Sequence, residues 1–301
     1  MDTDIIHPSG GNIEWNESFY FSFYDKKNDI CAFMRIGLKQ NKCLKNMFCF
    51  FMMPDGAHIG LKDDDKYDND SLVAKNLKFN KITPEKKWNL KFDGKLINFA
   101  NGKPIEVSFD FDFESLNKIF DYRDCVSGIK EKISRSVASE HLEQFGKATG
   151  KLKVGDNDYS INGLGERDHS WGVRDWNAPK MWIWLTCQFN DKLALNVTKL
   201  TVSEGEVDAG FIHMDGKNIP LMKAVIDTDY ASDGSPVKFT MDLHDKNGDV
   251  HRVNARIIKN VKLPFTSGDG KKQSTMHETL SEYEMDGKIG YGIAEYLIRD
   301  F

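Results

Sequence analysis

The residues that could do chemistry are concentrated between Gly163 and Trp176, where the chain reads GLGERDHSWGVRDW. This run contains one imidazole, three carboxylates, two guanidiniums and two indoles. Buried charges need partners and aromatic rings shape apolar space, so the composition predicts the wall of a ligand cavity. The same composition also fits a buried ion-pair cluster that fixes the packing of two sheets, with Trp171 as a core residue.

If this run is a strand, successive side chains point to opposite faces. His169 then shares a face with Arg167 and Trp171, while Asp168 lies with Glu166 on the other. We predict that His169 and Trp171 face a cavity. We expect Asp168 to orient or pair with a charge on a neighbouring strand.

A second informative strand is predicted at 181–189, where both faces are largely apolar. Trp182 and Trp184 share one face with Thr186 and Gln188. Two indoles beside a polar pair suit a pocket that surrounds an apolar ligand and orients one polar end. Ordinary core packing is the alternative interpretation.

Two further groups of charges could take part in the chemistry. His141 and Glu143 share a face of an alternating segment, where they could form an acid–base pair or one exposed salt bridge. Glu295 lies among apolar residues near the end of the chain. It is predicted to point inward as a partner of Arg167 or Arg174, unless it is a surface residue.

The elements that must position these residues are strands. Short alternating apolar segments recur along the chain, bounded by Asp, Asn, Lys and Gly, which indicates an all-β sandwich or barrel. Exceptions are 129–145, predicted as a short helix running into a strand, and 114–120, which could hold one or two helical turns. The two halves offer similar numbers of strand candidates, and they meet near the helical segment, so we predict two β units, 1–145 and 146–301. The dipeptides predicted as hairpin turns are Asp93-Gly94, Asn101-Gly102, Asp215-Gly216, Asn247-Gly248 and Asp286-Gly287.

Composition restricts the function classes. A net charge of -5 argues against a nucleic-acid partner, and no apolar run is long enough to span a bilayer. No signal peptide is visible, and five cysteines without a CxxC pair predict reduced thiols in a cytoplasmic protein without structural zinc. The acidic run 62–70 is predicted as a solvated loop, and it lacks the Gly and Glu of a calcium-binding EF-hand. Gly163-Leu-Gly165 lacks the rest of a dinucleotide fingerprint.

The block from Gly165 to Trp176 resembles the signature of the hydroxyneurosporene synthase (carotenoid 1,2-hydratase) and tocopherol-cyclase-like superfamily. His141-Leu-Glu-Gln144, Met181-Trp-Ile-Trp184 and the GYGIAEY segment near the end fit the same pattern. More closely, the chain is similar to uncharacterised bacterial and archaeal members of that group. The likeness is strong over most of the second half and is only a β pattern in the first half.

This resemblance implies two lipocalin-like β-barrels, with the last strand free to return to the first domain, and a cofactor-independent enzyme. The substrate would be an isoprenoid or terpenoid that undergoes acid-assisted hydration, cyclisation or isomerisation, with no metal. Asp168 is the expected acid, which requires burial to raise its pKa, and His169 or Glu143 would orient it or accept a proton. The alternative is a carrier that binds a lipid without chemistry. The expected substrate-contacting residues are Arg167, Trp171, Arg174, Trp176, Trp182, Trp184, His141 and Glu295. Transient contact of the protein with a membrane surface is compatible with such an apolar ligand.

Overall fold

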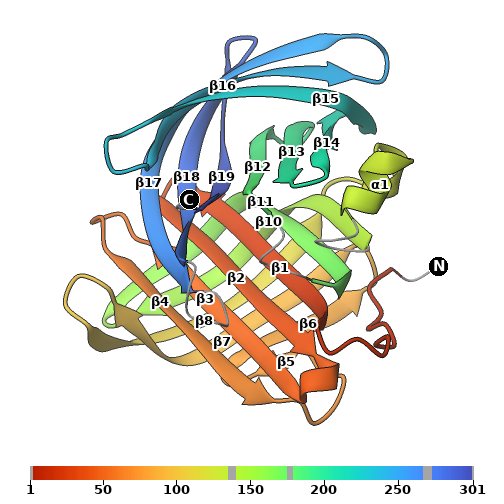
Figure 1. The fold of residues 1–301 in the computed structure, drawn as a ribbon. Helices are drawn as coiled ribbons and strands as arrows, with labels where there is room; N and C mark the ends of the chain where they lie inside the picture. The colour runs from red at the N-terminus through yellow and green to blue at the C-terminus, as the bar shows by residue number, and fades with distance from the viewer. Residues whose placement is uncertain (1–2, 135–139, 175–178, 267–272, 300–301) are drawn as a thin grey trace. The chain divides into compact units, whose positions relative to one another are not determined.

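The computed structural model describes residues 3–134, 140–174, 179–266 and 273–299, and these form an all-β protein with one short α-helix (Figure 1). The predicted fold class is therefore confirmed. The chain divides into two compact units, one comprising Met1–Ile119 and Ala138–Arg174 and the other Phe120–Val137 and Asp175–Phe301.

The first unit contains one large antiparallel sheet. Its strand order is β4-β3-β2-β1-β11-β10-β8-β7-β6-β5. β4 also pairs with β7 through Ile59–Asn98 and Gly60–Ile97, so the eight strands from β4 to β7 close into a ring. The strands are β1 (Trp15–Asp25), β2 (Ile30–Lys39), β3 (Leu44–Met52), β4 (His58–Lys66), β5 (Val73–Ala74), β6 (Leu77–Thr83), β7 (Lys87–Asn98), β8 (Lys103–Ser115), β10 (Glu140–Val154) and β11 (Asn157–Val173).

The second unit contains a closed eight-stranded barrel. Each strand pairs with its neighbour in sequence, and β19 returns to pair with β12. The strands are β12 (Met181–Asn190), β13 (Leu193–Val202), β14 (Gly205–Met214), β15 (Lys217–Tyr230), β16 (Pro236–Asp245), β17 (Val250–Thr266), β18 (Gln273–Met285) and β19 (Lys288–Arg299). This unit also contains the two-residue strand β9 (Phe120–Asp121) and the helix α1 (Ile129–Ser134).

The segment after residue 145 does not follow the predicted division of the chain. β10 and β11 extend to Val173 and both belong to the first sheet, where β11 pairs with β1 along Trp15–Tyr24. The last strand, β19, stays in the second barrel. Alternation predicts that a strand exists but does not identify its partner, so the sequence could not assign β11 to β1.

Each sheet has its own apolar core because alternate side chains point to the same face. In the first unit, Phe19, Phe21 and Phe23 of β1 belong to one buried cluster with residues from the other long strands. In the second unit, the corresponding cluster includes Leu195 and Tyr283. We call the face of each sheet that carries this cluster its core side and the opposite face its outer side.

Several local predictions can be checked against the backbone. Asp215 and Asp286 have positive φ, as expected in tight hairpin turns, and α1 precedes β10 as predicted. Asp93-Gly94, however, lies inside β7 and makes no turn. The acidic run 62–70 begins inside β4. No helix forms at 114–120, where β8 continues to Ser115 and β9 begins at Phe120.

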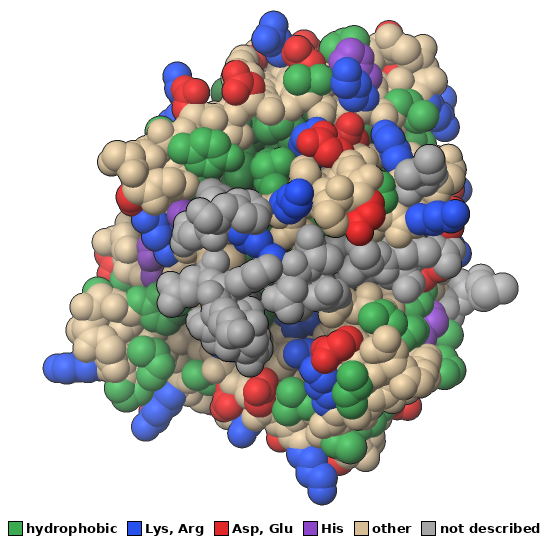
Figure 2. Space-filling view, viewed as in Figure 1, with side chains coloured by type: hydrophobic (Ala, Val, Ile, Leu, Met, Phe, Trp, Pro, Cys, Tyr) green, Lys and Arg blue, Asp and Glu red, His purple; other side chains and the backbone are tan. Residues whose placement is uncertain are grey.

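None of the described helices is long and apolar enough to cross a membrane. Figure 2 shows one face of the molecule, on which basic and acidic side chains are interspersed. Hydrophobic side chains lie between them in small groups.

Candidate functional site

The motif at 163–176 lies mainly on β11, and its side chains separate onto the two sides of the first sheet. On the core side, the His169 ring stacks on Phe19, and the Arg167 guanidinium lies 5.8 Å from the centre of the Trp88 ring. On the outer side, Asp168 contacts His141 of β10. The predicted alternation is therefore confirmed, and it distributes the predicted residues between two separate clusters.

The outer-side cluster consists of His141, Glu143 and Asp168. His141 Nε2 lies 2.7 Å from Asp168 Oδ2 and 2.8 Å from Glu143 Oε1. The Glu143 side chain is fully buried, whereas 16% of the Asp168 side chain is exposed. His141 and Glu143 thus form a buried ion pair, and the alternative of an exposed salt bridge is wrong.

The protonation of this cluster follows from burial and charge together. Burial opposes a charged imidazole, but Asp168 and Glu143 outweigh it and raise the pKa of His141 to about 10. Burial likewise opposes ionisation of Asp168, but His141 and Arg174 more than offset it and lower the pKa of that carboxyl. The sequence-based expectation that burial keeps Asp168 protonated is therefore wrong, because a cation lies in hydrogen-bonding range.

Arg174 lies near the outer-side cluster at the end of β11. Its Nη2 donates a hydrogen bond of 2.7 Å to Ser170 Oγ, and its charge helps to lower the pKa of Asp168. Asp168 thus pairs with a charge on a neighbouring strand, as expected, and that charge is His141 of β10, with Glu143 and Arg174 nearby. Trp176, the other residue predicted from this end of the motif, lies outside the described residues.

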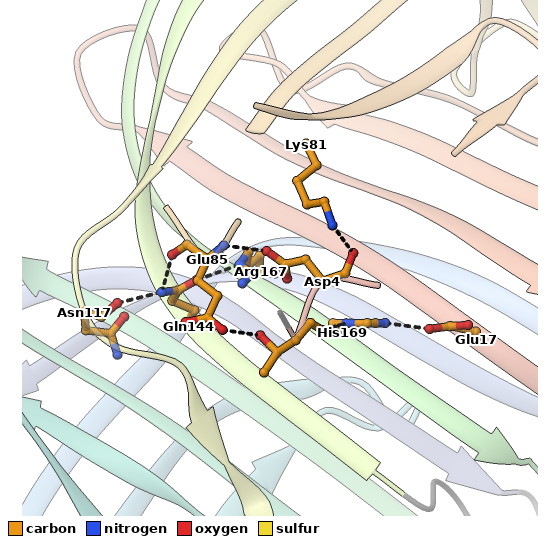
Figure 3. A network of polar contacts seen from close by, with 9 residues as sticks. Asp4, Glu17, Lys81, Glu85, Asn117, Gln144, Arg167 and His169 are labelled. Carbon is orange, nitrogen blue, oxygen red and sulfur yellow. Dashed lines mark hydrogen bonds and ion pairs between the residues drawn. The ribbon is translucent and has the colours of Figure 1, made fainter. Parts of the chain in front are cut away.

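On the core side, Arg167 is the centre of a buried polar network (Figure 3). Its Nη1 donates to Asp4 Oδ1 and its Nε donates to Gln144 Oε1, both at 2.7 Å. Gln144 Nε2 donates in turn to the backbone carbonyls of Glu85 and Asn117. Asp4 closes the network by accepting from the backbone N–H of Glu85 at 2.6 Å. Arg167 is thus paired with Asp4 rather than with the predicted Glu295.

Glu17, His169 and His7 form a second core-side cluster. Glu17 Oε1 lies 2.9 Å from His169 Nε2 and 2.8 Å from His7 Nδ1. The backbone N–H of His7 donates to Glu17 Oε2 at 2.9 Å. The His7 ring stacks on Trp171, with the ring centres 3.8 Å apart. Residues from three separate parts of the chain therefore meet at one carboxyl group.

Hydrogen-bond donors in this second cluster can be assigned from its surroundings. His169 Nδ1 lies 3.0 Å from the carbonyl of Thr3, so this nitrogen carries the proton. Burial lowers the pKa of His169 to about 3 and raises that of Glu17 to about 8. At neutral pH a protonated Glu17 then donates to the unprotonated Nε2 of a neutral His169. The sequence predicted a buried carboxylic acid with a raised pKa at Asp168, whereas the structure has such an acid at Glu17.

Sequence reasoning missed His7, Asp4 and Glu17. A signal existed for Glu17, which is the only charge in the run from Trp15 to Tyr24, where it sits among aromatic residues. His7 and Asp4 precede the first strand and follow no periodic pattern, so nothing in the sequence assigns them to the core side of the sheet.

In the second unit, the two predicted tryptophans lie on β12. Trp182 and Trp184 are buried on the outer side of the barrel, while Ile183 and Leu185 belong to its core. The expectation that both faces of this strand are buried is confirmed. Whether these indoles line a pocket stays a prediction.

Glu295 lies beside Trp184 on the same side of the barrel. It also pairs directly with Glu278 of β18. Burial, followed by the charge and hydrogen bond of Glu295, raises the pKa of Glu278 well above its ordinary value. Glu278 therefore favours its protonated form beside Glu295.

Two groups among the described residues have the donor types and spacing to hold a metal ion. They are His7, Glu17 and His169 on the core side of the first sheet, and His141, Glu143 and Asp168 on its outer side. In the outer-side group, both carboxylates approach the same imidazole nitrogen, which matches a shared proton rather than a cation.

Comparison with known proteins places this geometry in a family context. A family model described as "Domain of unknown function (DUF7064)" matches residues 2–299. Among curated proteins, no sequence matches this one.

Solved structures share the fold at low sequence identity. A Nitrosomonas europaea protein with a provisional AttH assignment has a TM-score of 0.67 and 10% identity, over 99% of this chain and 98% of its own. CghA, crystallised with Sch210972, has a TM-score of 0.62 and 11% identity, over 100% of this chain and 96% of its own. Kievitone hydratase from Nectria haematococca has a TM-score of 0.62 and 11% identity, over 93% of this chain and 88% of its own.

Proposed function

The chain belongs to the DUF7064 family, a domain of unknown function, and for this member we propose an enzyme that moves protons to and from an apolar small molecule. The observation that carries the proposal is the buried cluster of His141, Glu143 and Asp168. An imidazolium between two carboxylates can release and recover a proton without changing its geometry, as general acid–base catalysis requires.

Each member of the cluster has a distinct role in this proposal. Asp168 is the least buried of the three, so it exchanges the proton with the substrate. His141, only 2.7 Å away, stores that proton, and Glu143 stabilises the imidazolium. In a hydration, the proton passes from His141 through Asp168 to an alkene carbon, and water attacks the cation. The surplus proton of the added water then returns through Asp168 to His141, which balances the cycle.

The substrate class is supported by the resemblance of the motif and by the fold. Kievitone hydratase is a hydratase by name, and CghA was crystallised with a small molecule. The motif resembles the hydroxyneurosporene synthase and tocopherol-cyclase-like superfamily, which favours an isoprenoid or terpenoid and hydration, cyclisation or isomerisation. The cycle needs only water and the chain's own proton-transfer groups.

A carrier without chemistry is the second candidate. The closed eight-stranded barrel of the second unit favours it, because barrels of this size can hold one small ligand. A carrier would bind a lipid tightly, form no product and be insensitive to replacement of Asp168.

One experiment separates the two candidates. Purified protein is incubated with kievitone and a panel of prenyl quinols and carotenoid precursors, and products and retained ligands are identified by mass spectrometry. For a substrate that turns over, Asp168→Asn should lower kcat by about 10²–10⁴-fold. The matched control is Asp110→Asn, which changes an exposed carboxylate paired with Lys91 on the same sheet.

Turnover that is unchanged in Asp168→Asn would refute the proposed role of Asp168. Retained ligand without product, in both wild type and variant, would identify a carrier. Loss of stability with unchanged ligand binding per folded molecule would assign the charged cluster a purely structural role.

A further inference from the structure

The cluster of His7, Glu17 and His169 offers two imidazole nitrogens and one carboxylate oxygen at a single point on the core side of the first sheet. Glu17 and His169 side chains are fully buried, and 22% of the His7 side chain is exposed. The proposed proton transfer at Asp168 does not use these residues. We propose that they form a binding site for one divalent transition-metal cation, with zinc as the best chemical match.

The donor atoms of the cluster are of the types that zinc prefers. Two imidazoles and one carboxylate are a ligand combination of catalytic zinc sites, which keep a fourth position for water or substrate. Magnesium and calcium prefer oxygen donors, so this site discriminates against them. The exposed edge of His7 gives a cation a path to the buried ligands.

The distances between the donor atoms are close to those around a zinc ion. Zinc–nitrogen and zinc–oxygen bonds of about 2.0–2.1 Å in a tetrahedron separate neighbouring donor atoms by about 3.3 Å. Glu17 Oε1 lies 2.8 Å from His7 Nδ1 and 2.9 Å from His169 Nε2, and all three donor atoms lie within 4.8 Å of one another. The two oxygen–nitrogen distances are about 0.5 Å shorter than this spacing and the two nitrogens lie within 4.8 Å of each other, so shifts on the order of 1 Å convert the hydrogen-bonded arrangement into a coordinating one.

The residues around the donor atoms hold both imidazole rings in place. A histidine that binds a metal almost always donates its other ring N–H to a carbonyl or carboxylate, which fixes the ring and directs the free nitrogen. His169 does this through Nδ1 and the Thr3 carbonyl, and its ring is stacked on Phe19 with 4.0 Å between ring centres. The His7 ring is fixed by its stacking on Trp171. The site is thus oriented before a cation arrives.

A cation here would also attach the start of the chain to the sheet. His7 and Thr3 precede β1, whereas Glu17 and His169 lie on β1 and β11. Binding should therefore reduce the exchange of backbone amides in residues 3–7, a readout that does not depend on catalysis.

The test uses the full chain without a histidine tag, stripped with a chelator and then titrated with Zn²⁺ alone by calorimetry. We expect one zinc per chain, bound at least tenfold more tightly than Mg²⁺ or Ca²⁺. Glu17→Gln and His7→Ala should each weaken zinc binding at least tenfold. His7 lies outside the strands, so His7→Ala should fold normally, as circular dichroism would verify. The matched control is His141→Asn, which changes the histidine of the other cluster and should bind zinc like the wild type.

Hydrogen exchange provides the second measurement. Zinc should slow amide exchange in residues 3–7 of the wild type and leave it unchanged in His7→Ala. The proposal is overturned if the wild type binds no zinc at micromolar concentrations. It is also overturned if His141→Asn abolishes zinc binding while His7→Ala and Glu17→Gln retain it. Neither result depends on turnover, so the proposed function stands or falls separately.

Discussion

Replacing Asp168 by asparagine should lower the pKa of His141 and destabilise the folded protein. Asp168 and Glu143 lie 2.7 Å and 2.8 Å from the same His141 nitrogen, so each contributes a similar share of the attraction. The pKa of His141 rises from 6.5 to about 10. At about 1.4 kcal/mol for each tenfold change in the ionisation constant, that rise corresponds to about 5 kcal/mol.

Burial opposes this rise, so the two carboxylates together supply more than the net value, and removing one of them should cost at least about 2–3 kcal/mol; breaking a buried ion pair typically costs about 3–5 kcal/mol. His141 has a raised pKa, so the charged ring stabilises the folded protein fully below pH 6.5, and this stabilisation is lost as the pH rises towards 10. Asp168 has a lowered pKa, so its contribution is complete above pH 3.8 and is lost as the pH falls through that lowered value. The difference between wild type and Asp168→Asn should thus be largest between pH 3.8 and 6.5.

Urea unfolding at pH 6 measures the stability change, and an NMR titration of the histidine rings measures the pKa. The His141 resonance is assigned by its absence in His141→Asn. Glu143→Gln is the matched variant and should produce a loss of similar size. A wild-type His141 that titrates below pH 7 would refute the electrostatic reasoning, as would an Asp168→Asn variant as stable as the wild type at pH 6.

Three more outcomes follow from the structure. Gly165→Ala should destabilise the protein by about 2–3 kcal/mol in urea unfolding, because the added Cβ would lie 1.8 Å from the Ser22 carbonyl oxygen. Gly11→Ala is the control: its Cβ meets open space, so the stability should change little. Equal losses in the two variants would contradict this prediction. In the metal-free protein, Glu17→Gln should gain stability relative to wild type as the pH rises from 4.5 to about 8, since ionising the buried carboxyl costs the folded state; a pH-independent difference would exclude the raised pKa. Glu278→Gln should cost under about 1 kcal/mol in thermal unfolding because the carboxyl is already neutral beside Glu295, and a much larger loss would show that Glu278 is ionised.

Turns and loops predicted from local sequence were wrong where the segment pairs with a neighbouring strand. Asp93-Gly94 has the composition of a hairpin turn, yet it continues through β7 because both flanking segments pair with β8. The acidic run from Lys62 also extends a strand, in which residues up to Lys66 pair with β3. In both cases hydrogen bonding along a long ladder stabilises an extended conformation that the local sequence does not favour.

The sequence by itself determined the all-β class, the alternation along β11, the shared face of His141 and Glu143, and the expectation that Asp168 pairs with a charge on a neighbouring strand. These depend on side-chain period and on short hairpin connections, which local residues encode. Only the tertiary structure decided that Asp168 is ionised, because its pKa depends on the distance to a nitrogen on another strand. Only the tertiary structure placed His7 and Glu17 beside His169, since that contact joins the first residues to β11 across more than 150 positions, and periodicity carries no information over such a separation.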